Sequence, residues 1–204
     1  MSARCLALTM CAALTVTACA IGKPIPQATT YVVEPPTEKN HPVATRRPQT
    51  LRMGNVRVAA AYAGNPLVYR LDDVRYVSDP YHAFIAEPGA MLGNQMAQWL
   101  DHAGLFESVA QPGSGRPATF VLEATVTELY GDFRRGSSPA AVLVVQFVLI
   151  DPAGSRPRLV NEQTIASRVD LPQASPDELV RGYGKALAEV LAQFVRTLDD
   201  QHVE

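Results

Sequence analysis

The chain has 204 residues, of which 47% are hydrophobic and 19% are charged, and its formal net charge is -2. This apolar content excludes an intrinsically disordered or collagen-like chain, and the length favours one folded domain with additional segments over two domains. Its 18 basic residues are matched by 20 acidic ones. The chain therefore lacks the excess of positive charge typical of nucleic-acid binding, and nucleic acid is not an expected partner.

The N-terminus has the features of an export signal for a lipoprotein. Arg4 precedes an apolar run over residues 5–18, which has the length of a secretory h-region and is too short for a membrane-spanning helix. The run ends in Val16-Thr17-Ala18-Cys19, an order that resembles a bacterial lipobox. We expect residues 1–18 to be removed and Cys19 to carry the lipid. Because Ala20 follows instead of Asp, we expect anchoring in the outer membrane, facing the periplasm, in a Gram-negative host.

Residues 19–30 are predicted to be a tether, and residues 31–204 the folded domain. Six prolines lie between Ala20 and Thr50, which is typical of a linker. Fully extended, residues 20–30 reach about 35 Å. Cys5 and Cys11 belong to the predicted signal, so a lipidated mature chain has no free thiol for a disulfide, a zinc site or a nucleophile.

The first half of the domain alternates between strand patterns and one helix pattern. Strands are expected at residues 31–34, from Leu51 through the alternating stretch to about Ala60, at 67–71, at 74–78 and at 106–110. The Asp79-Pro80 pair is expected to end the fourth of these strands. A helix is predicted over 88–103, with Pro88 near its start, Gly104 after its end and Trp99 on its buried face.

The second half predicts three longer strands followed by a helix. The strands cover 119–130, 141–150 and 158–169, and the short turn-rich loops between them favour an antiparallel meander with the most apolar strand in the middle. Ser175 and Glu178 predict a capping box for a helix that runs to about Leu198 with one apolar face. The expected fold class is α+β, a mainly antiparallel sheet with two helices packed on one face.

No catalytic or metal-binding motif stands out. The four histidines (His41, His82, His102 and His202) lack metal-ligand spacing, and the aspartate pairs 72–73 and 199–200 fall in predicted turns or at a helix end. Gly182-Tyr183-Gly184 lies inside the last helix, where glycine favours close packing over phosphate binding. We therefore expect no enzymatic activity, cofactor or metal site.

One segment is a candidate partner-binding site. An aromatic, a carboxylate, a second aromatic and two guanidinium groups are concentrated where the first strand of the meander is expected to end, and tyrosine and arginine are favoured interface residues. The alternative interpretation is an ordinary surface turn. The candidate residues are Tyr130, Asp132, Phe133, Arg134 and Arg135.

Several short motifs, taken in order, resemble the ABC-type transport auxiliary lipoprotein family, to which the lipoprotein of the paraquat-inducible system belongs. The resemblance covers most of residues 31–198, and one departure is Ile85, where the family pattern has a tryptophan. The motifs are Tyr31-Val32-Val33-Glu34-Pro35-Pro36, Leu67-Val68-Tyr69-Arg70, Ala86-Glu87-Pro88, Gly104-Leu105-Phe106 and Glu128-Leu129-Tyr130-Gly131-Asp132-Phe133-Arg134.

This resemblance implies a nonenzymatic subunit of a transport system for lipids or other hydrophobic molecules. The implied partners are an ABC permease, its ATPase and a mammalian-cell-entry (MCE) domain protein, with the membrane contacted through the lipid anchor. A homo-oligomer is also an open expectation. The alternative is a periplasmic carrier module that itself holds an apolar ligand between helices and sheet.

Overall fold

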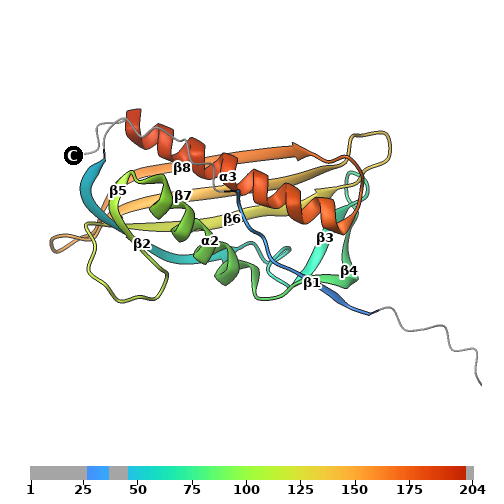
Figure 1. The fold of residues 1–204 in the computed structure, drawn as a ribbon, viewed down its shortest axis with the longest axis horizontal. Coiled ribbons are helices and arrows are strands. Elements are labelled where there is room, and N and C mark those ends of the chain that lie inside the picture. Colours follow the sequence, from blue (N-terminus) through green and yellow to red (C-terminus); the bar gives the residue numbers. More distant parts are fainter. Residues whose placement is uncertain (1–26, 37–45, 201–204) are drawn as a thin grey trace, which may run out of the picture.

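The computed structural model describes residues 27–36 and 46–200, and Figure 1 shows their arrangement. The predicted signal peptide, Cys19 and the tether up to residue 26 lie outside the described residues, as do His41 and His202. Neither helix within the described ranges has the length and apolar character needed to cross a membrane.

The first half of the described chain forms five strands and one helix. The predicted helix over 88–103 and the strand over 106–110 are confirmed, and Trp99 is buried. The first strand lies earlier than predicted, because its pairing with β4 begins at Thr29 and ends at Tyr31. In order, the elements are β1 (Thr29–Tyr31), β2 (Arg47–Val58), β3 (Pro66–Arg70), β4 (Tyr76–Phe84), α2 (Pro88–Ala103) and β5 (Phe106–Ala110).

Strand β4 continues through Asp79-Pro80, so the prediction that this pair ends the strand is wrong. The register with β3 jumps from Val68↔Ser78 to Pro66↔Ala83, and the residues between are bulged away from the ladder. Proline is tolerated at a bulge because no ladder hydrogen bond is needed there. The Asp79 carboxylate accepts the backbone N–H groups of Tyr81 and His82 instead.

The second half follows the predicted order of three strands and a helix. These elements are β6 (Phe120–Asp132), β7 (Ala140–Asp151), β8 (Arg158–Asp170) and α3 (Pro176–Asp200). The antiparallel meander is confirmed, since β7 lies between β6 and β8 and pairs with both over most of its length.

The eight strands form one mixed sheet, and the expectation of a mainly antiparallel sheet is wrong. The path β1-β4-β3-β6-β2-β5 is joined by β7 on β6 and by β8 on β7. Among the described strands, four pairs are parallel (β1·β4, β2·β5, β2·β6 and β3·β6) and three are antiparallel. Both β2 and β3 pair with β6, although they lie far from it in the sequence. Short turns reveal only the pairs of chain neighbours, so they could not predict these parallel pairs.

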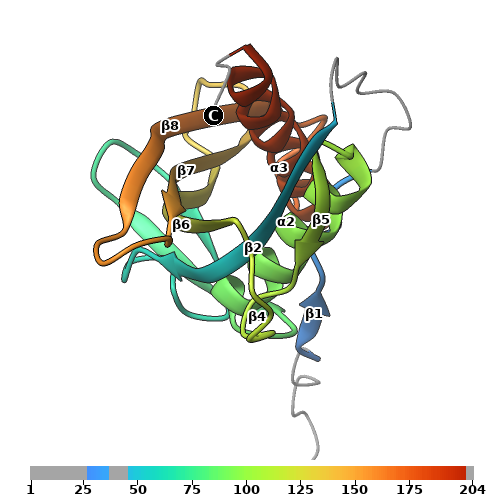
Figure 2. The ribbon, with the colours of Figure 1, turned by 90° about the vertical axis from the view of Figure 1, so that its left-hand side faces the viewer.

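The two helices cover one face of the sheet, as predicted, and the overall class is α+β. Helix α2 packs on β2 and β5, helix α3 packs on β7 and β8, and the helices contact each other. Figure 2 shows the sheet curving around them. The core between these layers is almost entirely apolar; for example, the ring centroids of Phe147 and Phe194 lie 4.6 Å apart.

Local signals at the start of α3 work as the sequence predicts, with one difference. The Ser175 hydroxyl accepts the backbone N–H of Glu178 at 3.4 Å, as in a capping box, but the Glu178 carboxylate pairs with Arg181 at 2.6 Å. The prediction of close packing at the two glycines is confirmed. A Cβ at Gly182 would lie 2.6 Å from Leu171, and one at Gly184 would lie too close to the Glu34 carbonyl.

Candidate functional site

The predicted partner-binding segment is less exposed than the sequence suggests. Strand β6 runs on to Asp132 because two strands pair with it there. Strand β7 matches Ala140 with Asp132 on one side, and β3 matches Arg70 with Asp132 on the other. Tyr130 is therefore 6% exposed and Asp132 only 1% exposed. Phe133 and Arg134 are half-buried, and Arg135 is the one exposed residue of the five candidates. The interpretation of this segment as a surface loop is thus wrong for its first residues.

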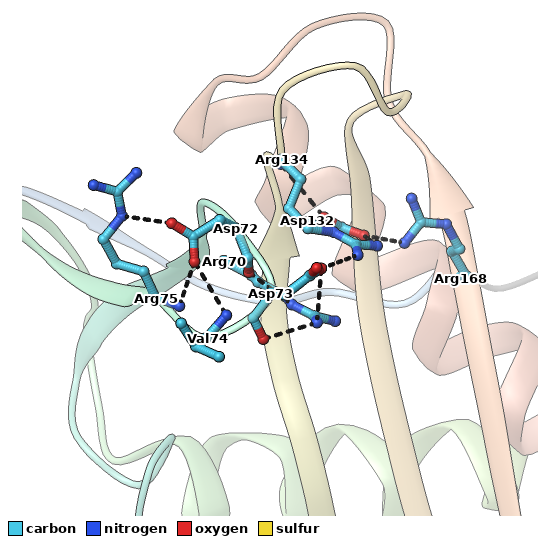
Figure 3. A network of polar contacts seen from close by, with 8 residues as sticks. All are labelled: Arg70, Asp72, Asp73, Val74, Arg75, Asp132, Arg134 and Arg168. Carbon is cyan, nitrogen blue, oxygen red and sulfur yellow. Dashed lines mark hydrogen bonds and ion pairs between the residues drawn. The ribbon is translucent and has the colours of Figure 1, made fainter.

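Asp132 is the centre of an ion-pair network at the end of β6 (Figure 3). Arg134 donates from Nε to Oδ1 and from Nη2 to Oδ2, both at 2.8 Å, and Arg168 on β8 donates from Nη1 to Oδ2 at 2.7 Å. These hydrogen bonds, above all those from Arg134, outweigh burial and hold the pKa of Asp132 well below its usual range. A buried carboxylate paired in this way is a structural anion and not a general acid or base near neutral pH.

The network extends to the turn between β3 and β4. Asp73 in this turn accepts a hydrogen bond from Arg134 Nη1 at 3.2 Å and lies 3.7 Å from Arg70 Nη2. The neighbouring Asp72 accepts the backbone N–H groups of Val74 and Arg75, which lowers its pKa, and also pairs with the Arg75 side chain at 3.2 Å. Residues far apart in the sequence are thereby joined at one edge of the fold.

Aromatic side chains flank the network. Phe133 stacks on Tyr69 with ring centroids 5.0 Å apart, and both contact the main core. Tyr130 packs instead with Val68 and Val142 in a separate small apolar cluster. In that cluster the Tyr130 ring contacts the rings of Tyr62 and Tyr76, and the Arg70 guanidinium lies 5.7 Å from the Tyr76 ring centroid. The candidate segment therefore contributes side chains to the main core and to the small apolar cluster, in addition to forming the ion pairs.

A second polar cluster, which the sequence analysis missed, lies on the β4 bulge. Asp79 Oδ2 accepts the Tyr69 hydroxyl at 2.6 Å and lies 2.8 Å from His82 Nδ1. Burial acts to raise the pKa of Asp79, but the hydrogen bonds from Tyr69 and the backbone outweigh it and lower that pKa. The Asp-Pro pair is the only local signal for this cluster, because aspartate often accepts backbone N–H groups in turns.

Two surface hollows lie near these elements. One, of about 600 Å³, lies between the β3–β4 turn and the loop after β6 and is lined by Asp72, Asp73, Arg75, Arg134 and Arg135, among others. The other, of about 680 Å³, lies between α3 and β8 and is lined by Ala166 and Ser167 of β8 and by residues of α3 that include Lys185, Glu189 and Arg196. Within the part of the chain that the structure describes, no group of three or more potential ligands is placed to hold a metal ion.

The described residues form a domain of the α+β class, and comparison with known proteins gives its family. A family model described as ABC-type transport auxiliary lipoprotein component matches residues 31–195. The chain belongs to this family, which confirms the resemblance drawn from its motifs and makes it a lipid-anchored protein of the cell envelope. Among curated proteins, none matches the chain.

Solved structures show the same fold. A crystal structure of a Xanthomonas campestris protein has a TM-score of 0.70 at 16% identity, and the match covers 85% of this chain and 99% of that one. An uncharacterized protein has a TM-score of 0.65 at 21% identity, covering 84% and 99%. A hypothetical protein from Chlamydia trachomatis has a TM-score of 0.50 at 12% identity, covering 75% and 96%. At such identities the likeness extends to the fold alone.

Proposed function

We propose that this protein is a nonenzymatic auxiliary subunit of an ABC-type transport system that moves lipids or other hydrophobic molecules across the envelope. Its partners in this proposal are the ABC permease, the ATPase and an MCE-domain protein of the same system. The observation that carries the proposal is the family match over residues 31–195, which spans nearly all of the described fold.

The chemistry of the described polar groups supports a nonenzymatic role. Asp132, Asp72 and Asp79 are each held by several hydrogen bonds, and their lowered pKa values keep them ionised near neutral pH. Groups with this bonding stabilise strand ends and turns, whereas proton transfer needs a pKa near the working pH.

We propose that Cys19 carries the anchor and that the domain faces the periplasm from the outer membrane. The lipobox and Ala20 support this assignment. The Cys19→Ser variant should lose its lipid label and leave the membrane fraction. Retention of both label and membrane association would contradict the assignment.

The experiment that tests the transport role is co-purification from native membranes. The tagged full-length chain should bring down a permease, an ATPase and an MCE-domain protein in fixed proportions, identified by mass spectrometry. The Cys19→Ser variant, expressed at the same level, is the control for anchoring. Recovery of the intact, anchored chain without any transporter component would contradict the proposal.

The alternative, a carrier that holds an apolar ligand between helices and sheet, has less support. The interior of that space is filled by core side chains in contact, such as Phe147 with Phe194, and the groove at its edge, between α3 and β8, is lined by charged residues as well as alanines. Apolar ligands favour concave, mostly apolar sites. An apolar ligand retained through gentle purification and identified by mass spectrometry would favour the carrier.

Self-association of this subunit also stays a prediction. Within the described residues β8 pairs only with β7, so its second edge is available for pairing with another chain. A mass measurement of the purified chain in solution tests this prediction, and a strictly monomeric protein would contradict it.

A further inference from the structure

One end of the domain gathers arginines around two neighbouring segments, residues 70–75 and 132–138. We call these segments, with Arg168 beside them, the basic end. It contains five arginines and three aspartates, a net charge of +2, and the exposed Asp170 at the end of β8 reduces this to +1. The surface is therefore mildly positive, whereas the whole chain has a net charge of -2.

The arginines of the basic end are not equivalent. Arg134 and Arg168 are engaged by the buried Asp132, and Arg70 contacts the backbone of the turn and the Tyr76 ring. Arg75 and Arg135 are exposed; Arg75 has a solvent-exposed pairing with Asp72, and both line the hollow of about 600 Å³. These two guanidinium groups are thus the ones that can reach an anion outside the domain.

An exposed apolar side chain lies next to Arg75 in the turn between β3 and β4. Val74 is the most exposed large hydrophobic residue of the described chain, with 89% of its surface accessible. The turn that presents it is rigid, because the Asp72 carboxylate accepts the N–H groups of Val74 and Arg75. Val74 lies between Asp73 and Arg75 in the sequence, and an exposed apolar residue next to an arginine suits a surface that enters the headgroup region of a membrane.

The position of the basic end relative to the lipid anchor also favours contact with the membrane. Figure 1 shows β1, where the described domain begins, at the end of the long axis that also holds β3, β4 and the loop after β6. Cys19 precedes Thr29 by ten residues, so a lipid on Cys19 lies within about 35 Å of β1 even if the linker is fully extended. The anchored domain therefore holds this end near the membrane.

We propose that the basic end is a membrane-contact surface, in which Arg75 and Arg135 bind phosphates of anionic phospholipid headgroups and Val74 enters the interface. The proposal rests on the lipid anchor and not on the association with a transporter. A protein partner would also bind arginines, but the short linker and the exposed Val74 favour the membrane. Each arginine near an anionic surface strengthens contact about fivefold.

The test uses a tryptophan placed at the tip of the turn. The lipidated full-length Val74→Trp chain is reconstituted in phosphatidylcholine vesicles with and without phosphatidylglycerol, and quenching by lipids brominated near the glycerol is measured. The native Trp99 is buried and gives the same background in every sample. Leu159→Trp is the matched control, because Leu159 is 57% exposed and lies at the start of β8, about 30 Å from Arg168 at its other end.

The charge dependence is tested in the Val74→Trp chain. Arg75→Glu with Arg135→Glu should weaken the contact at least 25-fold, at about fivefold or more for each arginine. Arg116→Glu with Arg156→Glu makes the same charge change at two exposed sites outside the basic end and should have little effect.

Quenching at position 74 that exceeds quenching at 159, increases with phosphatidylglycerol and falls in the first double variant supports the proposal. Equal quenching at positions 74 and 159 would mean that the lipid anchor alone brings the domain to the membrane, and it would overturn the proposal. An equal loss of quenching in both double variants would also overturn it. Absence of quenching at 74 would overturn it in favour of a protein partner. None of these outcomes bears on co-purification of the transporter, so the two proposals fail separately.

Discussion

The helix-covered face of the sheet and the ion-pair network at the end of β6 stabilise the fold in different ways. The covered face is a continuous apolar core in which many side chains from both helices and most strands share the burial. The network is a few charged groups, and one buried carboxylate holds guanidinium groups from two other positions. The stability of the covered face depends on a repeated pattern of apolar residues, whereas that of the network depends on the identity of single charged residues.

The sharpest way to break the covered face is to place a charge in it. Leu191→Asp puts an unpaired carboxylate at a position of α3 that is 0% exposed. It loses the burial of a leucine, about 2 kcal/mol, and adds the cost of desolvating a charge, so we expect a loss above about 4 kcal/mol and no stable fold. Circular dichroism and urea unfolding measure this. The exposed Leu159→Asp is the control and should change stability by less than about 0.5 kcal/mol.

A smaller effect is expected from removing the centre of the network. Asp132→Asn keeps the shape of the side chain but loses the charge that both Arg134 and Arg168 contact, so we expect a cost of about 2 to 3 kcal/mol. The control is Asp151→Asn, which disrupts an ion pair with the exposed Arg158 and should cost less than about 1 kcal/mol. Equal urea midpoints for the two variants would show that the buried Asp132 contributes no more to stability than the more exposed Asp151.

The same carboxylate should also make the fold sensitive to acid. Because the pKa of Asp132 is lower in the folded state than its ordinary value of 3.8, the unfolded chain takes up the proton first. Its contribution to stability is therefore complete above about pH 5 and decreases as pH falls toward the folded pKa, with about 1 kcal/mol lost by pH 3. Urea unfolding at pH 7 and pH 3 measures how much unfolding free energy is lost on acidification. This loss should be smaller by about 1 kcal/mol in Asp132→Asn than in the parent chain. An identical pH dependence would assign the acid sensitivity to other carboxylates.

The elements of the covered face could be predicted from the sequence because their signals are local. The three- and four-residue spacing of α3, the hydroxyl of Ser175 at its start and the short turns of the meander all lie within a few residues of what they specify. The parallel pairs of β6 with β2 and β3 have no such signal. They join segments separated by two or more other elements, and alternation along a strand does not identify its neighbour.

The candidate site was predicted only in part for the same reason. The sequence identified Asp132 and Arg134 as neighbours, but their partners Asp73 and Arg168 lie 61 and 36 residues away from Arg134 and Asp132, respectively. The exposure of this segment was misjudged because β3 and β7 both pair with the end of β6 and extend the strand to Asp132. The charged residues therefore looked like a surface loop, while the fold uses them to close the edge of the sheet.

The smallest effect is expected where a polar group sits inside the covered face itself. The Tyr183 hydroxyl on α3 is buried, and burial raises its pKa well above the usual value; no described residue forms a hydrogen bond with it. Tyr183→Phe keeps the ring and its contact with Phe84 while removing an unsatisfied hydroxyl, so stability should stay the same or rise by up to about 1 kcal/mol. Tyr69→Phe is the matched control, because its hydroxyl donates to Asp79 and its loss should cost about 1 to 2 kcal/mol. Both variants are compared with the parent by urea midpoint at constant m-value. If Tyr183→Phe lost as much stability as Tyr69→Phe, the Tyr183 hydroxyl would have a hydrogen-bond partner in solution. The stability of the helix-covered face would then depend on a single polar residue, as that of the ion-pair network does.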